Sequence, residues 1–379
     1  MEYTKLKCIN QYKSESINPA KTPDTVFEMY SVPIYETGHP EYLRGDEIAS
    51  NKAVVQKNDI LLCKINPRIN RVWVVSDESD KMNIASSEWI VIRNSEYNPE
   101  FLAWYFRTPK FQKLMTSEVT GIGGSLTRAQ PKCVAEYPVP VLDRVKQDEI
   151  VDILNKCKFV IESRKQELTA LDDLIKARFV ELFGNPITND RGWEVAELNT
   201  VCDGIGDGLH GTPEYDEDGE YPFINGNNLM DGVIKVTPAT KMVNEDTYKK
   251  HFIELTDNAI LLSINGTLGK LAFYNGEEVM LGKSACYCNL KPEINREFVY
   301  GVMKTDAFAG FLESNATAST IKNVGLKAIR GFKLILPPEE LQFQFIEFAN
   351  QVDKSKVAVQ KALDETQLLF DSLMQEYFG

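Results

Sequence analysis

The chain has 379 residues, of which 43% are hydrophobic and 26% are charged. This length can hold two or three compact domains. No run of about 18 apolar residues is present, and the N-terminal residues lack the apolar segment of a signal peptide, so we expect a cytoplasmic protein without a membrane partner. Seven cysteines without a Cys-x-x-Cys pair, and only three histidines, argue against a disulfide framework and against a metal site.

The formal net charge is −13, which at first argues against a nucleic-acid partner. The acidic residues are unevenly distributed, however, because basic and acidic side chains balance over residues 1–145. Affinity for DNA depends on the few cations that meet phosphates, so an acidic total does not exclude it. Such a chain would need a more basic partner to bind DNA tightly.

In the first globular part, apolar runs predict strands at 54–65, 71–75 and 88–92. A helix is expected over Pro99 to Ser117, followed by a glycine-rich loop at 121–124 and a strand over 137–141. These elements indicate a mixed α/β unit over residues 1–142, with strands too irregularly spaced for a doubly wound sheet.

A long helix is expected over 143–184. Its apolar residues recur at alternating spacings of four and three, interrupted by two arginines, at Ile150, Leu154, Cys157, Ile161, Arg164, Leu168, Leu171, Ile175, Arg178 and Leu182. Asp143 could cap its start, and Gly184 stands where a glycine would end it. The same pattern also suits an ordinary amphipathic helix on a core, but its length favours a helix–helix pair.

The second globular part, residues 185–337, has the same predicted order. Strands are expected at 259–264, 270–274 and 284–290, then a helix over 296–313 and a strand over 332–336. The Gly-, Asp- and Asn-rich stretch 203–232 predicts loops, including a turn at 204–208. A second long helix over 338–379, with Pro338 in its first turn, carries a seam at Phe345, Ala349, Val352, Lys356, Val359, Leu363, Thr366, Phe370, Leu373 and Tyr377.

The two halves are copies of one another. Glu181, Phe183 and Gly184 recur as Glu376, Phe378 and Gly379, about 195 residues later, far beyond the period of roughly 20–50 residues typical of solenoid repeats. Asn-Asp-Ile-Leu-Leu at 58–62 likewise returns as Asn-Ala-Ile-Leu-Leu at 258–262. We therefore predict a pseudo-twofold protein in which two similar globular units are separated by two long helices that pair with each other, suited to a target with two halves.

No group of residues indicates catalysis. The phosphate-binding Gly-x-x-x-x-Gly-Lys-Ser/Thr motif is absent, and the glycine-rich stretch 204–208 does not precede a helix. Asn-Pro-Ile-Thr at 185–188 lacks the second proline and the aromatic ring of an amino-methyltransferase motif. A binding module explains these absences better than an enzyme does.

Two polar loops in each unit suit hydrogen bonding to phosphates and base edges. The loop 65–71 aligns with 264–270 after one residue is dropped, and both end on a cation; 125–128 aligns with 320–323. Taken singly, each loop could be a hairpin turn with solvated charges. The candidate DNA-binding residues are Lys64, Asn66, Arg68, Arg71, Ser125, Thr127, Arg128, Lys132, His210, Asn265, Thr267, Lys270, Thr320, Lys322, Asn323 and Lys327.

The arrangement resembles the specificity (S) subunit of type I restriction–modification enzymes over the whole chain. The resemblance is carried, in order, by Phe-Glu-Met-Tyr-Ser-Val-Pro-Ile-Tyr-Glu from Phe27, Asn-Asp-Ile-Leu-Leu-Cys-Lys-Ile-Asn-Pro-Arg from Asn58, Asp-Gly-Leu-His-Gly-Thr-Pro-Glu-Tyr from Asp207 with Tyr-Pro-Phe-Ile-Asn from Tyr221, and Leu-Ile-Leu-Pro-Pro-Glu-Glu-Leu-Gln from Leu334. The family's Pro-Pro-x-x-x-Gln is kept as Pro337, Pro338 and Gln342. The first copy, Val-Leu-Asp from Val141 with Gln147, departs from it, which should affect only capping.

The resemblance implies four segments: target recognition domains at 1–142 and 185–337, and spacer helices at 143–184 and 338–379. Each recognition domain would read one half of a bipartite, asymmetric site on double-stranded DNA. The two long helices would form an antiparallel coiled coil that acts as a spacer. They would also dock two methyltransferase subunits and, through them, restriction subunits. No cofactor is expected on this chain, because S-adenosylmethionine, ATP and magnesium would belong to the partner subunits, and the chain itself would not be an enzyme.

The duplication suggests how the candidate residues divide their roles. Positions alike in both units, such as Asn66 with Asn265, Arg71 with Lys270, Ser125 with Thr320 and Lys132 with Lys327, should position phosphates. Positions that differ, such as Arg68 against Thr267 and residues 127–128 against 322–323, are better candidates for reading bases.

The alternative function for the chain is a non-catalytic two-headed coiled-coil scaffold that binds protein partners. A methyltransferase or nuclease is a more distant alternative, and DNA and S-adenosylmethionine binding would separate all three.

Overall fold

The computed structural model describes residues 2–120 and 127–379, so the predicted glycine-rich loop at 121–124 lies outside the described residues. The chain divides into two compact units. The first unit contains residues 1–165 and 361–379, and the second contains residues 166–360. The boundary between the units cuts across both long helices, so each unit holds one part of each helix.

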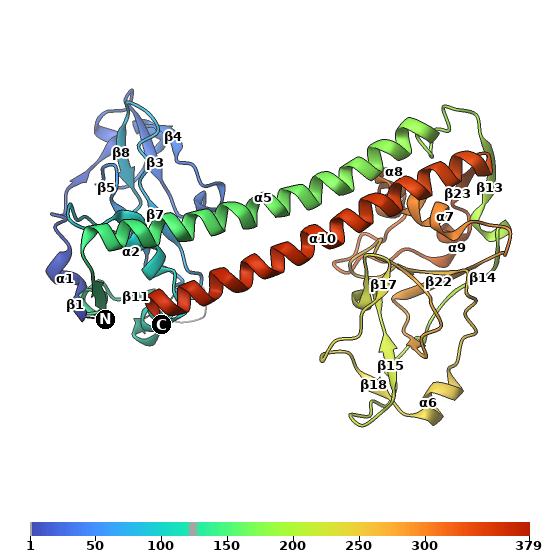
Figure 1. The fold of residues 1–379 in the computed structure, drawn as a ribbon. Coiled ribbons are helices and arrows are strands. Elements are labelled where there is room, and N and C mark those ends of the chain that lie inside the picture. Colours follow the sequence, from blue (N-terminus) through green and yellow to red (C-terminus); the bar gives the residue numbers. More distant parts are fainter. Residues whose placement is uncertain (1, 121–126) are drawn as a thin grey trace. The chain divides into compact units, whose positions relative to one another are not determined.

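The first unit contains two main sheets. A five-stranded sheet has the order β2 (Ser16–Ile17), β5 (Lys52–Val54), β8 (Met82–Ala85), β3 (Val26–Tyr30), β4 (Glu41–Arg44). A three-stranded sheet has the order β7 (Val72–Val74), β6 (Ile60–Cys63), β9 (Trp89–Ile92). The predicted strands near 60, 72 and 89 are therefore present, whereas most of the five-stranded sheet was not predicted. In Figure 1, β3, β4 and β8 form one end of this unit.

Shorter elements complete the first unit. β1 (Glu2–Lys5) pairs with β12 (Pro138–Val141), and β10 (Val119–Thr120) pairs with β11 (Arg128–Ala129). The short helices are α1 (Leu6–Ile9), α4 (Pro131–Val134), η1 (Pro19–Lys21), η2 (Tyr35–Thr37) and η3 (Gly45–Glu47).

The helix predicted over 99–117 is in fact two helices, α2 (Pro99–Phe106) and α3 (Pro109–Ser117). Thr108 is extended, with φ −67° and ψ 148°, and its side chain caps α3 by accepting a hydrogen bond from the Phe111 amide. A residue before proline disfavours the helical conformation, so Pro109 explains the break. The predicted helix over 296–313 divides in the same way into α7 (Arg296–Met303) and α8 (Asp306–Ser314), with Thr305 as the cap.

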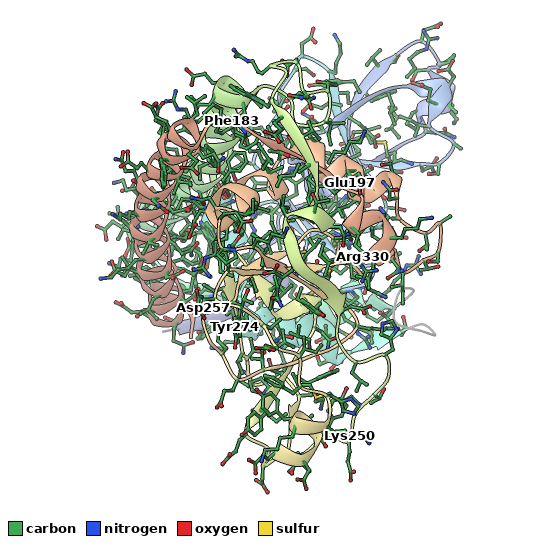
Figure 2. All side chains as sticks on the ribbon, turned by 90° about the vertical axis from the view of Figure 1, so that its right-hand side faces the viewer. Phe183, Glu197, Lys250, Asp257, Tyr274 and Arg330 are labelled. Carbon is green, nitrogen blue, oxygen red and sulfur yellow. The ribbon has the colours of Figure 1, made fainter. Side chains whose placement is uncertain are left out.

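The second unit repeats this plan. Its main sheet has the order β14 (Cys202–Asp207), β22 (Ala285–Leu290), β19 (Ala259–Ser263), β20 (Leu271–Phe273). A second sheet has the order β18 (Met242–Val243), β15 (Tyr221–Ile224), β21 (Met280–Leu281), and lies with α6 (Glu245–Lys250) at one end of the unit (Figure 1). In Figure 2, Phe183 marks the helical end and Lys250 the opposite end. The remaining elements are β13 (Glu194–Glu197), β16 (Leu229–Met230), β17 (Val233–Ile234), β23 (Lys333–Leu336), α9 (Leu326–Arg330), η4 (Leu198–Thr200) and η5 (Gly226–Asn228).

The prediction of loops throughout 203–232 was wrong. Residues 204–206 lie within β14, which pairs with β22, and 221–224 form β15. The glycines serve close packing here: a Cβ on Gly206 would lie 2.7 Å from the Tyr287 hydroxyl, and one on Gly208 would lie 2.0 Å from the Leu281 carbonyl oxygen. Glycine inside a strand marks such close approaches, and composition alone does not separate them from turns.

The two long helices are α5 (Arg144–Phe183) and α10 (Glu339–Phe378), of 40 residues each. Asp143 caps α5 by accepting a hydrogen bond from the Lys146 amide at 2.9 Å, as predicted. Pro338 precedes α10, and its carbonyl accepts from the Leu341 and Gln342 amides. Gly184 ends α5 with φ +72°, a conformation that glycine adopts without strain.

The helix starts are alike despite the different sequence of the first copy. Gln147 donates from its side-chain amide to the Leu142 carbonyl at 2.8 Å, and Gln342 donates to the Pro337 carbonyl at 2.8 Å. The helix ends are alike as well. The Phe183 ring packs 5.2 Å from that of Phe298 in the second unit, and the Phe378 ring 5.5 Å from that of Phe101 in the first. These buried phenylalanines explain the duplicated Glu-x-Phe-Gly signature.

No residue of the two predicted seams is exposed, which confirms their helical register. Their polar interruptions find partners. In the first unit, Arg164 donates to the Ala362 carbonyl and, at 2.8 Å, to the Thr366 hydroxyl. In the second unit, Lys356 pairs with Asp172 at 2.6 Å. Later in α5, the Phe179 ring packs 5.3 Å from the ring of Phe345, which lies earlier in α10 than Lys356, so the helices run antiparallel in the second unit.

Candidate nucleic-acid interface

In the first unit, three segments meet in a polar surface that we name the first corner: residues 64–71 after β6, Glu88 before β9, and residues 127–129. The backbone holds them together. The Asn66 amide donates to the Thr127 carbonyl at 2.8 Å, the Ala129 amide donates to the Lys64 carbonyl at 2.9 Å, and the Lys64 amide donates to the Glu88 carbonyl at 3.0 Å. Three segments far apart in sequence therefore present their side chains together.

The second unit has the same frame in a second corner, made of residues 264–270, Ser284 and residues 322–324. The Gly266 amide donates to the Lys322 carbonyl at 2.9 Å, the Val324 amide donates to the Ile264 carbonyl at 2.9 Å, and the Ile264 amide donates to the Ser284 carbonyl at 3.1 Å. Each bond has its equivalent in the first corner. The two corners thus share one backbone arrangement.

This frame corrects one predicted correspondence. The counterpart of Asn66 is Gly266 and not Asn265, because both donate equivalent backbone bonds and both have positive φ, +46° and +78°. Asparagine and glycine are the residues that adopt this conformation most readily. The dropped residue falls later in the loop, since the Cys63 amide donates to the Arg71 carbonyl as the Ser263 amide does to that of Lys270. The pairing of Arg71 with Lys270 therefore stands.

The side chains that the common frame presents differ between the corners. The equivalent pairs are Lys64 with Ile264, Asn66 with Gly266, Glu88 with Ser284, Thr127 with Lys322, and Arg128 with Asn323. A shared backbone with different donors and acceptors is the arrangement expected of two surfaces that recognise different sequences.

In the first corner, Arg128 is oriented by Glu88. Its Nε and Nη2 atoms donate to the two carboxylate oxygens at 3.1 Å each, and this bonding raises the pKa of Arg128 further above its ordinary value. A guanidinium has five N–H donors, so the contact with Glu88 uses two of them and not the other three. Arg68 is exposed, whereas Lys64 and Arg71 are half-buried, and Thr127 is buried. Ser125 lies outside the described residues.

In the second corner, Lys322 forms an ion pair with Glu313. The side-chain amide nitrogen of Asn265 donates to the side-chain oxygen of Asn323 at 3.4 Å. Thr267 and Thr320 are exposed, and Lys270 is half-buried. The Ser284 hydroxyl joins the corner to Asn225, 2.8 Å away. Next to Ser284, the Lys283 amide donates to the Leu209 carbonyl, so His210 lies on a segment bonded to this corner.

Lys132 and Lys327 do not belong to the backbone frame itself. They lie on the short helices α4 and α9, which follow residues 129 and 324 closely in each unit. Both side chains are exposed, and within the described parts of the chain neither forms an ion pair. Two equivalent free cations beside the two corners suit contacts to phosphates.

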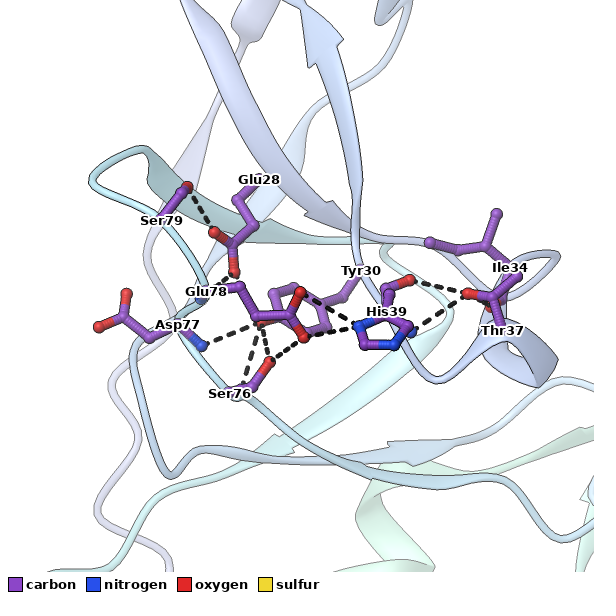
Figure 3. Close-up of polar contacts among 9 residues, drawn as sticks. All are labelled: Glu28, Tyr30, Ile34, Thr37, His39, Ser76, Asp77, Glu78 and Ser79. Carbon is purple, nitrogen blue, oxygen red and sulfur yellow. Dashed lines mark hydrogen bonds and ion pairs between the residues drawn. The ribbon is translucent and has the colours of Figure 1, made fainter. Parts of the chain in front are cut away.

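A separate polar cluster in the first unit surrounds Glu28, which is fully buried (Figure 3). Its carboxylate accepts hydrogen bonds from the Tyr30 hydroxyl at 2.9 Å, the Glu78 amide at 2.9 Å and the Ser79 hydroxyl at 2.6 Å. Burial raises the pKa of Tyr30 to about 12. These hydrogen bonds satisfy the buried carboxylate of Glu28 with groups of the same unit. The cluster therefore holds the loop 76–79 in place and offers no open reaction site.

The comparisons with known proteins agree with this geometry. Residues 190–366 match the family of type I restriction modification DNA specificity domains. This match spans the second corner, and the first unit repeats the backbone frame of that corner. The chain belongs to the type I specificity subunits. It supplies DNA sequence specificity in a type I restriction–modification system.

Solved structures show the fold of this specificity subunit over its full length. A chain from a structure described as showing complex assembly and conformational transition of the type I R-M system matches with a TM-score of 0.61 and 19% identity, covering 100% of this chain and 97% of that one. The type I S subunit from M. genitalium matches with a TM-score of 0.56 and 14% identity, covering 100% and 96%. At these identities the likeness establishes the mixed α/β fold with its long helices.

Sequence reasoning missed several residues of the specificity subunit's corners, above all Glu88, Ser284 and Asn225. Glu88 was overlooked because a carboxylate is not sought in a DNA-binding surface, although it orients Arg128. Ser284 could have been found because it is the first residue of a predicted strand, as Glu88 is in the first unit. Among the described residues, no group of three or more metal-ligating side chains is present, and no helix could span a membrane.

Proposed function

We propose that this specificity subunit reads a bipartite, asymmetric site on double-stranded DNA, with one corner directed to each half-site. The observation that carries the proposal is the common backbone frame of the two corners combined with their different side chains. Because the backbone frame is the same in both corners, each corner can approach the same structural feature of its own DNA segment. Different donors and acceptors give each half-site its own sequence.

The cations that both units share would contact the DNA phosphates and so position the subunit on the DNA. Arg71 with Lys270 and Lys132 with Lys327 occupy equivalent places and carry the same charge. Base reading falls to exposed or outward groups that differ, foremost Arg68 and Arg128 in the first corner and Lys322 and Asn323 in the second. Arginine held in a plane by a carboxylate suits bidentate contact with guanine.

The chemistry belongs to partner subunits in this proposal. The net charge of −13 leaves the chain poorly suited to bind DNA tightly alone, and a basic partner would supply the missing attraction. We expect two methyltransferase subunits to dock on the long helices, with restriction subunits joining through them. S-adenosylmethionine, ATP and magnesium would be bound by those partners, and the specificity subunit would be non-catalytic.

Methylation mapping tests the proposal. The genome of the host is sequenced for modified bases with the gene present, deleted and restored. We expect one bipartite methylated motif that disappears on deletion and returns on restoration. The purified chain alone should transfer no methyl group from S-adenosylmethionine to DNA. Unchanged methylation after deletion, or methyl transfer by the chain without partners, would show that the proposal is wrong.

A further inference from the structure

The second unit carries an imidazole beside its corner that a carboxylate holds in one orientation. The Nε2 atom of His210 lies 2.7 Å from Oδ2 of Asp207. The side chain of Asp207 is 16% exposed and that of His210 is 70% exposed. One edge of the ring therefore faces the carboxylate, while most of the ring remains open to solvent.

The backbone around this pair is fixed close to the second corner. The Leu209 amide donates to the Leu281 carbonyl at 2.8 Å, and the Lys283 amide donates to the Leu209 carbonyl at 3.1 Å. A Cβ on Gly208 would lie 2.0 Å from the Leu281 carbonyl oxygen, so the chain between Asp207 and His210 packs directly on the neighbouring strand. Ser284, the residue that follows Lys283, is part of the second corner itself.

The contact with Asp207 decides which ring nitrogen is free. An ionised carboxylate only accepts hydrogen bonds, so Nε2 must carry the hydrogen that it donates. In a neutral ring, Nδ1 then has a lone pair and accepts. The groups in the major groove that can donate to such an acceptor are the amino groups of cytosine and adenine.

We propose that Asp207 is a positioning residue that fixes His210 with Nδ1 as a hydrogen-bond acceptor for an exocyclic amino group of one base in the second unit's half-site. This inference rests on the proposed function, because it assigns one contact within that recognition. The ligand is thus cytosine or adenine at a single position. Guanine and thymine present only acceptors and a methyl group at the equivalent edge, and are disfavoured there.

The test measures binding by the specificity subunit in complex with its methyltransferase subunits at pH 8.5, where histidine side chains are ordinarily neutral. Duplexes carry each of the four bases in turn at every position of the mapped motif. We expect His210→Ala to lose roughly ten-fold discrimination at one position of one half-site, and to leave all other positions unchanged. His210→Gln should retain more of the preference if the base is adenine, which glutamine contacts through two hydrogen bonds, than if the base is cytosine, whose amino group offers it one.

Asp207→Asn tests the positioning role. Asparagine can both donate and accept, so the ring is no longer held in one tautomer, and discrimination at the same position should fall by a smaller factor. His39→Ala is the matched control, because His39 is an exposed histidine that also contacts a carboxylate, that of Glu78, within the cluster of Figure 3. It should leave every base preference unchanged.

Several results would overturn the inference. His210→Ala could leave all base preferences unaltered, or weaken binding equally for all bases, and in either case His210 reads no base. An effect of His210→Ala without any effect of Asp207→Asn would remove the positioning role. If the wild-type complex itself shows no base preference in this half-site, the proposed function fails instead, and the two failures are thereby distinguished.

Discussion

Asp59 and Arg93 illustrate how the two units solve one structural problem with different residues. Asp59 is 1% exposed in its side chain and accepts two hydrogen bonds from Arg93, at 2.7 and 2.6 Å, and a third from the Gln56 amide. In the second unit the equivalent positions are Ala259 and Asn289, as the pairing of β6 with β9 and of β19 with β22 shows. Asn289 bonds instead to the backbone at Thr256 and Glu254.

This difference predicts a non-additive effect on stability. Arg93→Asn alone leaves a buried carboxylate without its partner and should lower the free energy of unfolding of the first unit by about 3–5 kcal/mol. The double variant with Asp59→Ala copies the second unit and should recover about 2 kcal/mol of that loss. Hydrogen exchange of the β6 and β9 amides measures this in the whole chain. Equal protection in the single and double variants would contradict the account.

At the residue scale, comparing the sequences of the two units identified equivalent residues correctly where their side chains carry the same charge. It identified them wrongly where only the backbone conformation is the same. Arg71 and Lys270 were matched correctly because both carry a cation at the end of the loop. Asn66 was matched to Asn265 by identity, although its structural counterpart is Gly266. Asn66 and Gly266 share a positive φ, a backbone property that the sequence indicates only weakly. The assignment of individual DNA contacts stays a prediction.

At the scale of elements, the long helices were predictable because their seams repeat over ten positions each, and no seam residue is exposed. The division of each shorter helical stretch into two helices was missed, although Pro109 gave the signal in the first unit. In the second unit the only signal was Thr305 before Asp306, a capping pattern that also occurs inside helices. The short strands of the five-stranded sheet are two to five residues long, too short for a clear alternation.

We expect the two long helices to set the length of the unread gap between the half-sites. Four residues inserted into both helices, after Lys165 and after Gln360, fall on the unit boundary and leave the contacts of Arg164 and Lys356 inside their units intact. Each helix lengthens by about 6 Å, slightly over one turn. The methylated gap should therefore lengthen by one or two base pairs of about 3.4 Å each.

The matched control for this change is a four-residue insertion between the exposed residues 217 and 218 of the second unit, which should leave the gap as it is. Methylation mapping reads out both variants. An unaltered gap after the helix insertion, or altered half-site sequences, would mean that the helices are not the spacer.

At the scale of the whole molecule, the internal duplication was the most informative feature of the sequence, because one repeated frame accounts for both corners. The duplication does not predict which side chains meet at each corner, because these side chains come from segments as far apart as residues 64 and 128 in the first unit. Backbone bonds between those segments, rather than any local pattern, bring them together. We therefore expect a division of labour in which each unit reads one half of the site.

Exchange of one unit's globular part is a decisive experiment for this division of labour. Residues 185–337 are replaced by the equivalent segment of another type I specificity subunit, with both long helices kept, and the methylated motif is mapped in the host. We expect one half-site to change to that of the donor, while the other half-site and the gap remain as before. A motif in which both half-sites change, or in which neither does, would contradict it.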